Sequence, residues 1–162
     1  MHSFSRVVTR AYFSLGTNLG SRAENLTLAV TSVARAEDYR TSRVYQSEPV
    51  GGVAQDDFWN MVLEVTTTAT PHELLARAHD AETAAHRTRE VHWGPRTLDV
   101  DIVWVDGVVS DEPELTIPHP RMYERAFVLV PLRELREDLV SEDALRRAVG
   151  RVTVLGTLET LH

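Results

Sequence analysis

Hydrophobic and polar residues alternate in patterns that divide most of the chain into strands and helices. Strand-forming apolar residues dominate the segments 7–15, 41–46, 58–68 and 98–105. Between them lie two segments with apolar residues at helical spacing, and each follows a capping sequence, SRAE in the first and TPHE in the second. The order strand, helix, strand, strand, helix, strand predicts an α+β fold, with a ferredoxin-like βαββαβ antiparallel sheet and helices packed on one face.

The remainder of the chain carries weaker signals and is expected to form a C-terminal extension of this fold. Asp106 and Gly107 are typical of a hairpin turn. The residues 126–132 form an apolar run that is assigned to no element, and SEDALRRAV has the pattern of a short helix. Because 162 residues is the size of one ordinary domain, residues 1–162 are expected to form a single domain.

Composition narrows the classes of function. The formal net charge is −7, which disfavours general nucleic-acid binding, since that depends on neutralising phosphates with Lys and Arg. The chain contains no cysteine, which excludes disulfides and thiolate metal sites. It has no apparent signal peptide and no apolar run of the length that crosses a membrane. We therefore expect a soluble cytoplasmic protein without nucleic-acid or membrane partners.

The last strand-like segment contains two acidic residues in the sequence WGPRTLDVDIVWV. Side chains alternate along a strand, so Asp99 and Asp101 are predicted to share a face. Strict alternation adds Val103 and Val105 to that face and assigns the other to Leu98, Val100, Ile102 and Trp104. The valines predict a buried face, where two neighbouring carboxylates repel each other unless a cation lies between them. Carboxylate ligands favour Mg²⁺ for that cation.

Basic residues cluster near these two acids despite the acidic composition. Arg87, Arg89 and Arg96 precede them, and Arg121 and Arg125 follow. Carboxylates that bind Mg²⁺ and arginines that neutralise phosphate are typical of phosphoryl transfer. The sequence has neither a Walker A motif nor a kinase glycine loop with its lysine, and a solvated charged face is the alternative interpretation.

The segment HWGPRTLDVDI resembles the signature of the 6-hydroxymethyl-7,8-dihydropterin pyrophosphokinases, a family of folate-biosynthesis enzymes. Further segments resemble the family in the same order, among them FSLGTNLG, YQSEPVGG, FWNMVLEV and LTIPHPRMYERAFVL, so that the resemblance spans about residues 11–132. It implies a ferredoxin-like fold. It also implies transfer of the β,γ-pyrophosphoryl group of ATP to the hydroxymethyl oxygen of the pterin, with release of AMP.

The resemblance also implies roles for individual residues. Asp99 and Asp101 match the residues that bind two Mg²⁺ ions, and Arg87, Arg89 and Arg96 match catalytic arginines that neutralise the phosphates. The implied ATP-binding residues are Ile102, Thr116, His119 and Arg125. The implied pterin-binding residues are Ser47, Val50, Phe58, Asn60, Trp93 and Phe127. The general base stays open, Asp99 being one candidate, and family members generally act as monomers.

Some positions depart from the family pattern. Glu114 replaces a common arginine, His86 a common glycine and His92 another common arginine, and the loop 82–93 is one residue short. Phe58 replaces a frequent tyrosine. These departures bear on ATP affinity and loop motion, and they keep open a catalytically impaired nucleotide- or pterin-binding module. An RNA-binding domain of the same topology is a third hypothesis, disfavoured by the acidic charge and the lack of a K/R-G-F segment.

Overall fold

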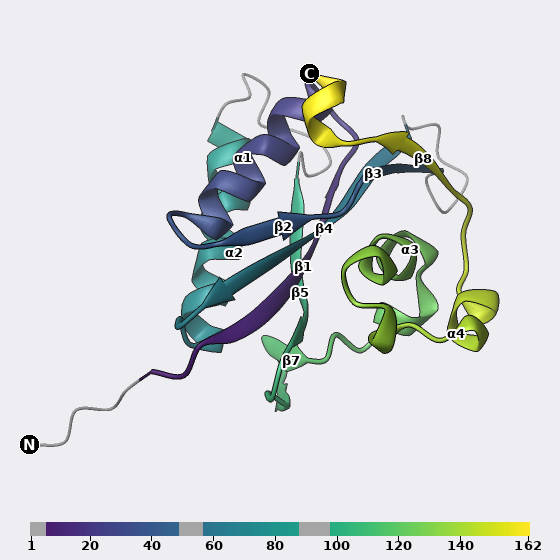
Figure 1. The fold of residues 1–162 in the computed structure, drawn as a ribbon. Helices are drawn as coiled ribbons and strands as arrows, with labels where there is room; N and C mark the ends of the chain where they lie inside the picture. The colour runs from purple at the N-terminus through teal and green to yellow at the C-terminus, as the bar shows by residue number, and fades with distance from the viewer. Residues whose placement is uncertain (1–5, 49–56, 88–97) are drawn as a thin grey trace, which may run out of the picture.

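The computed structural model of the chain describes residues 6–48, 57–87 and 98–162, apart from the side chain of Arg87 (Figure 1). The strands are β1 (Thr9–Thr17), β2 (Tyr39–Thr41), β3 (Val44–Ser47), β4 (Phe58–Thr67), β5 (Asp99–Val105), β6 (Ser110–Glu112), β7 (Leu115–Ile117) and β8 (Val152–Gly156). The α-helices are α1 (Arg22–Ala34), α2 (Pro71–Arg87), α3 (Ala126–Leu135) and α4 (Glu142–Arg147). The 3₁₀ turns are η1 (Met122–Glu124), η2 (Glu137–Leu139) and η3 (Leu158–Leu161).

The main sheet is antiparallel and has the strand order β5-β1-β4-β3-β8, with β2 paired to β4 beside β3. The predicted α+β class and the order of its strands and helices are confirmed. The predicted strand 41–46, however, is two short strands. They separate at the buried Ser42, whose N–H donates to the Val62 carbonyl at 2.9 Å and whose Oγ accepts from the Val62 N–H at 2.9 Å.

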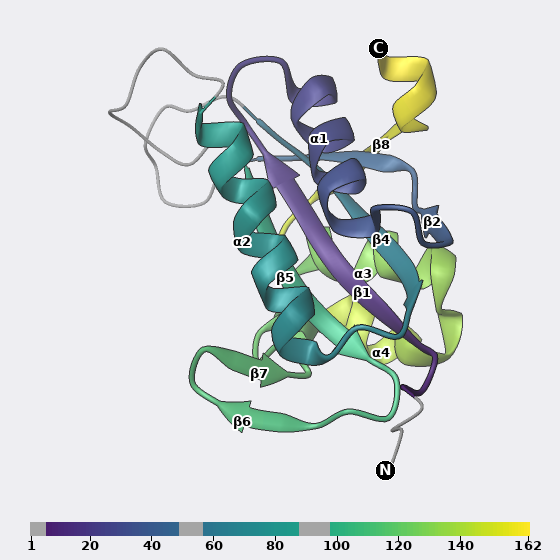
Figure 2. The same cartoon turned by 90° about the vertical axis from the view of Figure 1, so that its left-hand side faces the viewer.

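Helices α1 and α2 lie side by side on one face of the main sheet (Figure 2). Both begin at the predicted caps. Ser21 Oγ accepts from the Glu24 N–H at 3.4 Å. At α2 the box is reciprocal, since Thr70 Oγ1 accepts from the Glu73 N–H and the Glu73 carboxylate accepts from the Thr70 N–H, each at 3.1 Å. The apolar faces that follow these caps pack against the sheet in the larger hydrophobic core.

The two predicted helices, α1 and α2, share one face as expected, and the additional helix α3 covers the opposite face of the sheet (Figure 1). It is formed by the apolar run that the sequence pattern left unassigned. Its residues Val128, Leu129 and Leu132 pack in a second core with Tyr12 and Val62 of the sheet. None of the described helices is long and apolar enough to span a lipid bilayer.

The hairpin expected at Asp106 and Gly107 is replaced by a turn alone. Gly107 adopts φ 74°, a conformation that favours glycine, but β6 pairs with β7 and not with β5. The outer edge of β5 is instead used by a later segment, because the Val103 carbonyl accepts from the His119 N–H at 3.0 Å. The prediction of a β5 hairpin is therefore wrong.

A bulge in β5 also changes which of its side chains share a face. Tyr12 of β1 pairs with Trp104, whereas the next residue, Phe13, pairs with Ile102, so Val103 is an extra residue in the ladder. Val103 and Trp104 both pack in the core beneath α3, and Val105 packs in the core beneath α1 and α2. The strict alternation predicted for Trp104 and Val105 is therefore wrong, although it holds from Asp99 to Val103.

Candidate active site

Three adjacent strands bring the main polar residues of the candidate site together. In the sheet register Gly16 of β1 pairs with Asp99 of β5 on one side and with Asn60 of β4 on the other. Ser14 pairs with Asp101 in the same ladder. Residues two apart on a strand share a face, so these side chains lie on the face that α3 covers further along the sheet.

A cavity of about 560 Å³ opens above these residues, between the sheet, α3 and the segment before β8. It is lined by Ser14, Gly16, Ser47, Glu48, Phe58, Asn60, Asp99, Asp101, Arg121, Glu124, Arg125, Phe127, Val149, Gly150, Arg151 and Val152. The structure thus brings together four of the residues predicted for the pterin, Ser47, Phe58, Asn60 and Phe127, with both aspartates. We refer to this space as the large cavity.

A second cavity of about 260 Å³ lies between α2, β5 and the β6–β7 hairpin. Ile102, Thr116 and His119, three of the four residues predicted for ATP, line this small cavity. The fourth, Arg125, lines the large cavity instead. Asp101 is the one residue among those described that lines both cavities, so the two spaces adjoin at this residue.

The two aspartates are less buried than the sequence predicted. Asp99 is half-buried and Asp101 is exposed, whereas Val100 and Ile102 between and after them are buried. The apolar continuation of their face at Val103 is covered by α3, and that cover ends before it reaches the carboxylates. The two aspartates therefore lie at the solvent-accessible edge of a cavity. A cation and its other ligands can reach them there from the solvent.

Asn60 is held in a fixed orientation at the floor of the large cavity. The residue is 3% exposed, and its Nδ2 donates to Ser47 Oγ at 2.7 Å. The absence of a side chain at Gly16 leaves room for the amide, since a Cβ there would lie 3.2 Å from Asn60 Oδ1. A buried amide with a fixed rotamer can read the edge of a flat heterocycle.

His119 is neutral and its ring orientation is defined. Burial lowers the pKa of His119 below its usual value of 6.5, and the nearby Asp101 carboxylate opposes that shift. Its Nδ1 accepts a hydrogen bond from the Arg121 N–H at 3.1 Å. The remaining ring proton is thereby assigned to Nε2, which makes the ring a hydrogen-bond donor at the boundary of the small cavity.

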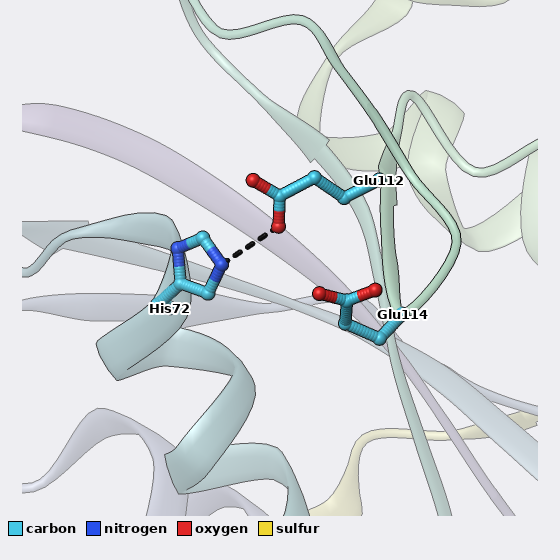
Figure 3. Close-up of side chains that lie close together, drawn as sticks. All are labelled: His72, Glu112 and Glu114. Carbon is cyan, nitrogen blue, oxygen red and sulfur yellow. Dashed lines mark hydrogen bonds and ion pairs between the residues drawn. The ribbon is translucent and has the colours of Figure 1, made fainter.

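Glu114 lines the small cavity and is exposed, as expected for a carboxylate in the place of a phosphate-binding arginine. Figure 3 shows it beside Glu112 and His72, whose Nε2 lies 2.8 Å from a Glu112 carboxylate oxygen. The ligand-type atoms of these three side chains lie within 4.8 Å of one another. All three residues are exposed, so water stabilises their charges and no bound cation is required.

Several predicted residues fall outside the described part of the chain. Arg89, Arg96, Val50 and Trp93 lie there, together with His92 and the side chain of Arg87. Conversely, the pattern of the sequence assigned no role to Gly16, Arg121 or Arg151, which line the large cavity. Arg121 stood out only as part of a basic cluster, and Arg151 had no local signal.

These features define the class of protein: an α+β fold with two adjoining cavities that meet at an aspartate. The chain belongs to the 7,8-dihydro-6-hydroxymethylpterin-pyrophosphokinase (HPPK) family, whose model matches residues 12–137.

Named relatives agree with this assignment. A Bacillus subtilis 2-amino-4-hydroxy-6-hydroxymethyldihydropteridine pyrophosphokinase is 42% identical over 135 residues, which cover 82% of this chain and 81% of that protein. A Methylorubrum extorquens protein of the same name is 39% identical over 153 residues and is covered to 97%. The bifunctional protein FolKE of Lactococcus lactis is 38% identical over 147 residues, and there the match covers 88% of this chain but only 42% of the relative.

A solved structure supports the fold independently. The crystal structure of Plasmodium falciparum HPPK-DHPS matches 98% of this chain and 46% of its own chain, with a TM-score of 0.58 and 12% sequence identity. At that identity the likeness establishes the shared α+β fold alone.

Proposed function

We propose that this chain transfers the β,γ-pyrophosphoryl group of ATP to 6-hydroxymethyl-7,8-dihydropterin, giving AMP and the pterin diphosphate in folate biosynthesis. Membership of the HPPK family and the names of the relatives support this activity. The structural observation that carries the proposal is the position of Asp101, which lines both the large and the small cavity. A group transferred between two ligands has to pass the point where their cavities adjoin.

The large cavity is proposed to bind the pterin. Phe58 and Phe127 offer aromatic faces for a flat ring, and Asn60, bonded to Ser47, offers an amide for its edge. Val50 and Trp93, outside the described residues, are proposed to complete this site. We propose that the hydroxymethyl end of such a ring lies near Asp99 and Asp101, since both residues line the same cavity.

The small cavity and its border with the large one are proposed to bind ATP. Ile102 provides an apolar wall, Thr116 a hydroxyl and His119 an imidazole donor. Arg125 lines the large cavity and is proposed to reach the phosphates from there.

The chemistry is a displacement at the β-phosphorus. The pterin hydroxyl oxygen forms a bond to that phosphorus, the bond from the phosphorus to the oxygen shared with the α-phosphate breaks, and AMP leaves with that oxygen. The hydroxyl proton passes to a base, for which Asp99 is one candidate. The residues contribute mainly by holding the two reactants in line and by placing positive charge around the phosphates, for which Arg87, Arg89 and Arg96 are proposed.

The carboxylates fit a magnesium site. Asp99 and Asp101 are oxygen ligands on one face of one strand, they line the same cavity, and they are open enough for substrate phosphates and water to complete a coordination shell. Two bound Mg²⁺ ions would neutralise part of the triphosphate charge there. The two aspartates would hold those ions and keep the phosphates at the border of the two cavities.

The proposed activity is tested by following AMP formation chromatographically from ATP. We expect AMP only when both hydroxymethyl-dihydropterin and Mg²⁺ are present, in equal amounts with the pterin diphosphate. Folded protein that forms no AMP under these conditions would contradict the proposal. If the same protein binds ATP or pterin in calorimetry without turnover, the result favours the impaired binding module, which the carboxylate of Glu114 in the nucleotide cavity supports.

Changing Asn60 to alanine is expected to raise the KM for the pterin by at least about tenfold, because a buried, fixed hydrogen-bonding amide is lost. The KM for ATP should change little. Steady-state kinetics with each substrate varied in turn measures both values. Ser42→Ala is the matched control, since it also removes a buried side-chain hydrogen bond but lies outside both cavities, and an equal effect of both substitutions would assign the loss to local structure.

Replacing Glu114 with arginine is expected to lower the KM for ATP about fivefold at low ionic strength, because a like charge near the triphosphate is replaced by an opposite one. The gain should shrink as salt is added. Glu159→Arg, the same reversal at an exposed residue that lines neither of the two cavities, is the control. An unchanged KM for ATP in Glu114→Arg would show that this carboxylate does not lie near the bound nucleotide.

We further propose that residues 1–162 act as a single pyrophosphokinase domain, that the chain is a monomer, and that it works in the cytoplasm on small-molecule substrates. Family membership supports the assignment of substrates. Light scattering of the purified chain measures its molar mass in solution and tests whether it is a monomer.

A further inference from the structure

The segment 149–152 forms a wall of the large cavity. Val149, Gly150, Arg151 and Val152 all line that cavity. The match to the family model ends at residue 137, so this wall lies beyond the part of the chain that the family model describes.

Main-chain hydrogen bonds fix this wall on both sides. The Val149 N–H donates to the Glu124 carbonyl at 2.8 Å, and the Val149 carbonyl accepts from the Ala126 N–H at 3.1 Å. On the other side Val152 pairs with Ser47, where β8 joins β3. Arg151 is therefore held between the segment that carries Arg125 and the strand that carries the pterin-site residue Ser47.

Three arginines line the large cavity, and their charges can interact with a ligand. Within the part of the chain that the structure describes, Arg121, Arg125 and Arg151 form no ion pair with a carboxylate. Arg40 and Arg136, outside the cavity, do form such pairs. Unpaired guanidinium groups around one cavity favour an anionic ligand.

The chemical class of the anion follows from the shape of the guanidinium and from the neighbouring acids. Arginine presents a planar set of donors that matches phosphate oxygens in pairs. Four acidic residues also line the cavity, Glu48, Asp99, Asp101 and Glu124, and they repel an anion unless it brings cations of its own. A metal-bound diphosphate satisfies both groups of side chains.

We propose that Arg151 is a phosphate-binding residue of the large cavity, and that the wall 149–152 positions it on the diphosphate that becomes attached to the pterin. The proposal rests on the proposed function for the identity of the ring. The interaction with the diphosphate itself is independent of that ring. Because the alcohol substrate has no phosphate, Arg151 distinguishes the phosphorylated product from the unphosphorylated pterin.

The test compares Arg151→Ala and Arg151→Lys with the wild-type chain by calorimetry, using magnesium pyrophosphate, hydroxymethyl-dihydropterin and the pterin diphosphate as separate probes. We expect Arg151→Ala to weaken binding of pyrophosphate and of the pterin diphosphate at least tenfold and to leave binding of the unphosphorylated pterin unchanged. Arg151→Lys should restore part of the affinity, since it keeps the charge and loses the paired donors. In kinetics, kcat/KM for ATP should fall with Arg151→Ala.

The control is Arg147→Ala, which removes an exposed arginine that pairs with Asp143 and lies outside the cavity. Unchanged pyrophosphate affinity in Arg151→Ala would overturn the proposal. So would an equal loss of affinity for the phosphorylated and unphosphorylated pterin, which would make the segment a structural wall only. A wild-type chain that binds pyrophosphate through Arg151 and yet forms no AMP would contradict the proposed function and support this inference.

Discussion

Replacing Asp101 with asparagine is expected to reduce AMP formation roughly a hundred- to a thousandfold, since the change removes one charge from the site where transferred phosphates are stabilised. The substitution keeps the size of the side chain. Asp101 is exposed, so its charge contributes little to the packing of β5. The loss should therefore fall on kcat and on the Mg²⁺ dependence, with the fold and the KM for the pterin nearly unchanged.

The measurement is the initial rate of AMP formation over a range of Mg²⁺ concentrations, together with the melting temperature of each variant. Asp111→Asn is the matched control, because Asp111 is an exposed aspartate on β6 that lines neither cavity. Wild-type rates in Asp101→Asn at every Mg²⁺ concentration would rule out a metal-binding role for Asp101. A melting temperature that falls together with the rate would attribute the effect to folding.

The second large effect concerns stability. Glu64 is 3% exposed and lies on the face of the sheet covered by α3, where its carboxylate accepts from Tyr12 at 2.6 Å and from two nitrogens of Arg40 at 2.8 and 2.7 Å. We expect Glu64→Ala to lower the free energy of unfolding by about 2–4 kcal/mol, because the buried Tyr12 hydroxyl loses its carboxylate acceptor and Arg40 loses its ion-pair partner. The figure is below that for a fully buried pair, since 56% of the Arg40 side chain is exposed.

The same carboxylate predicts a dependence on pH. The hydrogen bonds from Arg40 lower the pKa of Glu64 below its usual 4.5, against the opposing effect of burial. A carboxyl with a depressed pKa in the folded state stabilises the fold above its unfolded pKa and loses that contribution as the pH falls through the folded value. Wild-type stability should therefore decline below about pH 4.5 more steeply than that of Glu64→Gln.

Chemical denaturation of wild type, Glu64→Ala and Glu64→Gln measures these differences. Arg147→Ala is the control for an exposed ion pair and should change stability by less than about 1 kcal/mol. A Glu64→Ala variant as stable as the wild type would show that the pairing of Glu64 only offsets the cost of burying it.

The elements that the sequence predicted well are those with local signals. The caps at Ser21 and Thr70 determine where α1 and α2 begin, and their hydrogen bonds form within one turn of chain. Helix α3 lacked such a signal. It contains Pro131 and has no side-chain cap at Arg125, so its helical conformation depends on the apolar face of the sheet against which it packs.

The parts of the site that could be predicted are those determined by the residue pattern of a single strand. Alternation correctly assigned Asp99 and Asp101 to one face, and the structure shows that both residues line the large cavity. It failed at Trp104 and Val105, because a bulge arises from the match between two strands and leaves no pattern in either. The position of Arg151 was beyond sequence reasoning for a related reason, since its neighbours Ser47 and Arg125 are brought to it by pairings between distant segments.

Gly16 stands in the ladder between Asp99 and Asn60, with only 3.2 Å from the position of a Cβ to the amide oxygen of Asn60. We therefore expect the residues at positions 16 and 60 to constrain each other. A homologue with a side chain at position 16 would need a shorter or shifted side chain at position 60. The requirement for the Asn60 amide would then also constrain Gly16, which has no functional group. Among diverged relatives, substitutions at these two positions should be inherited together.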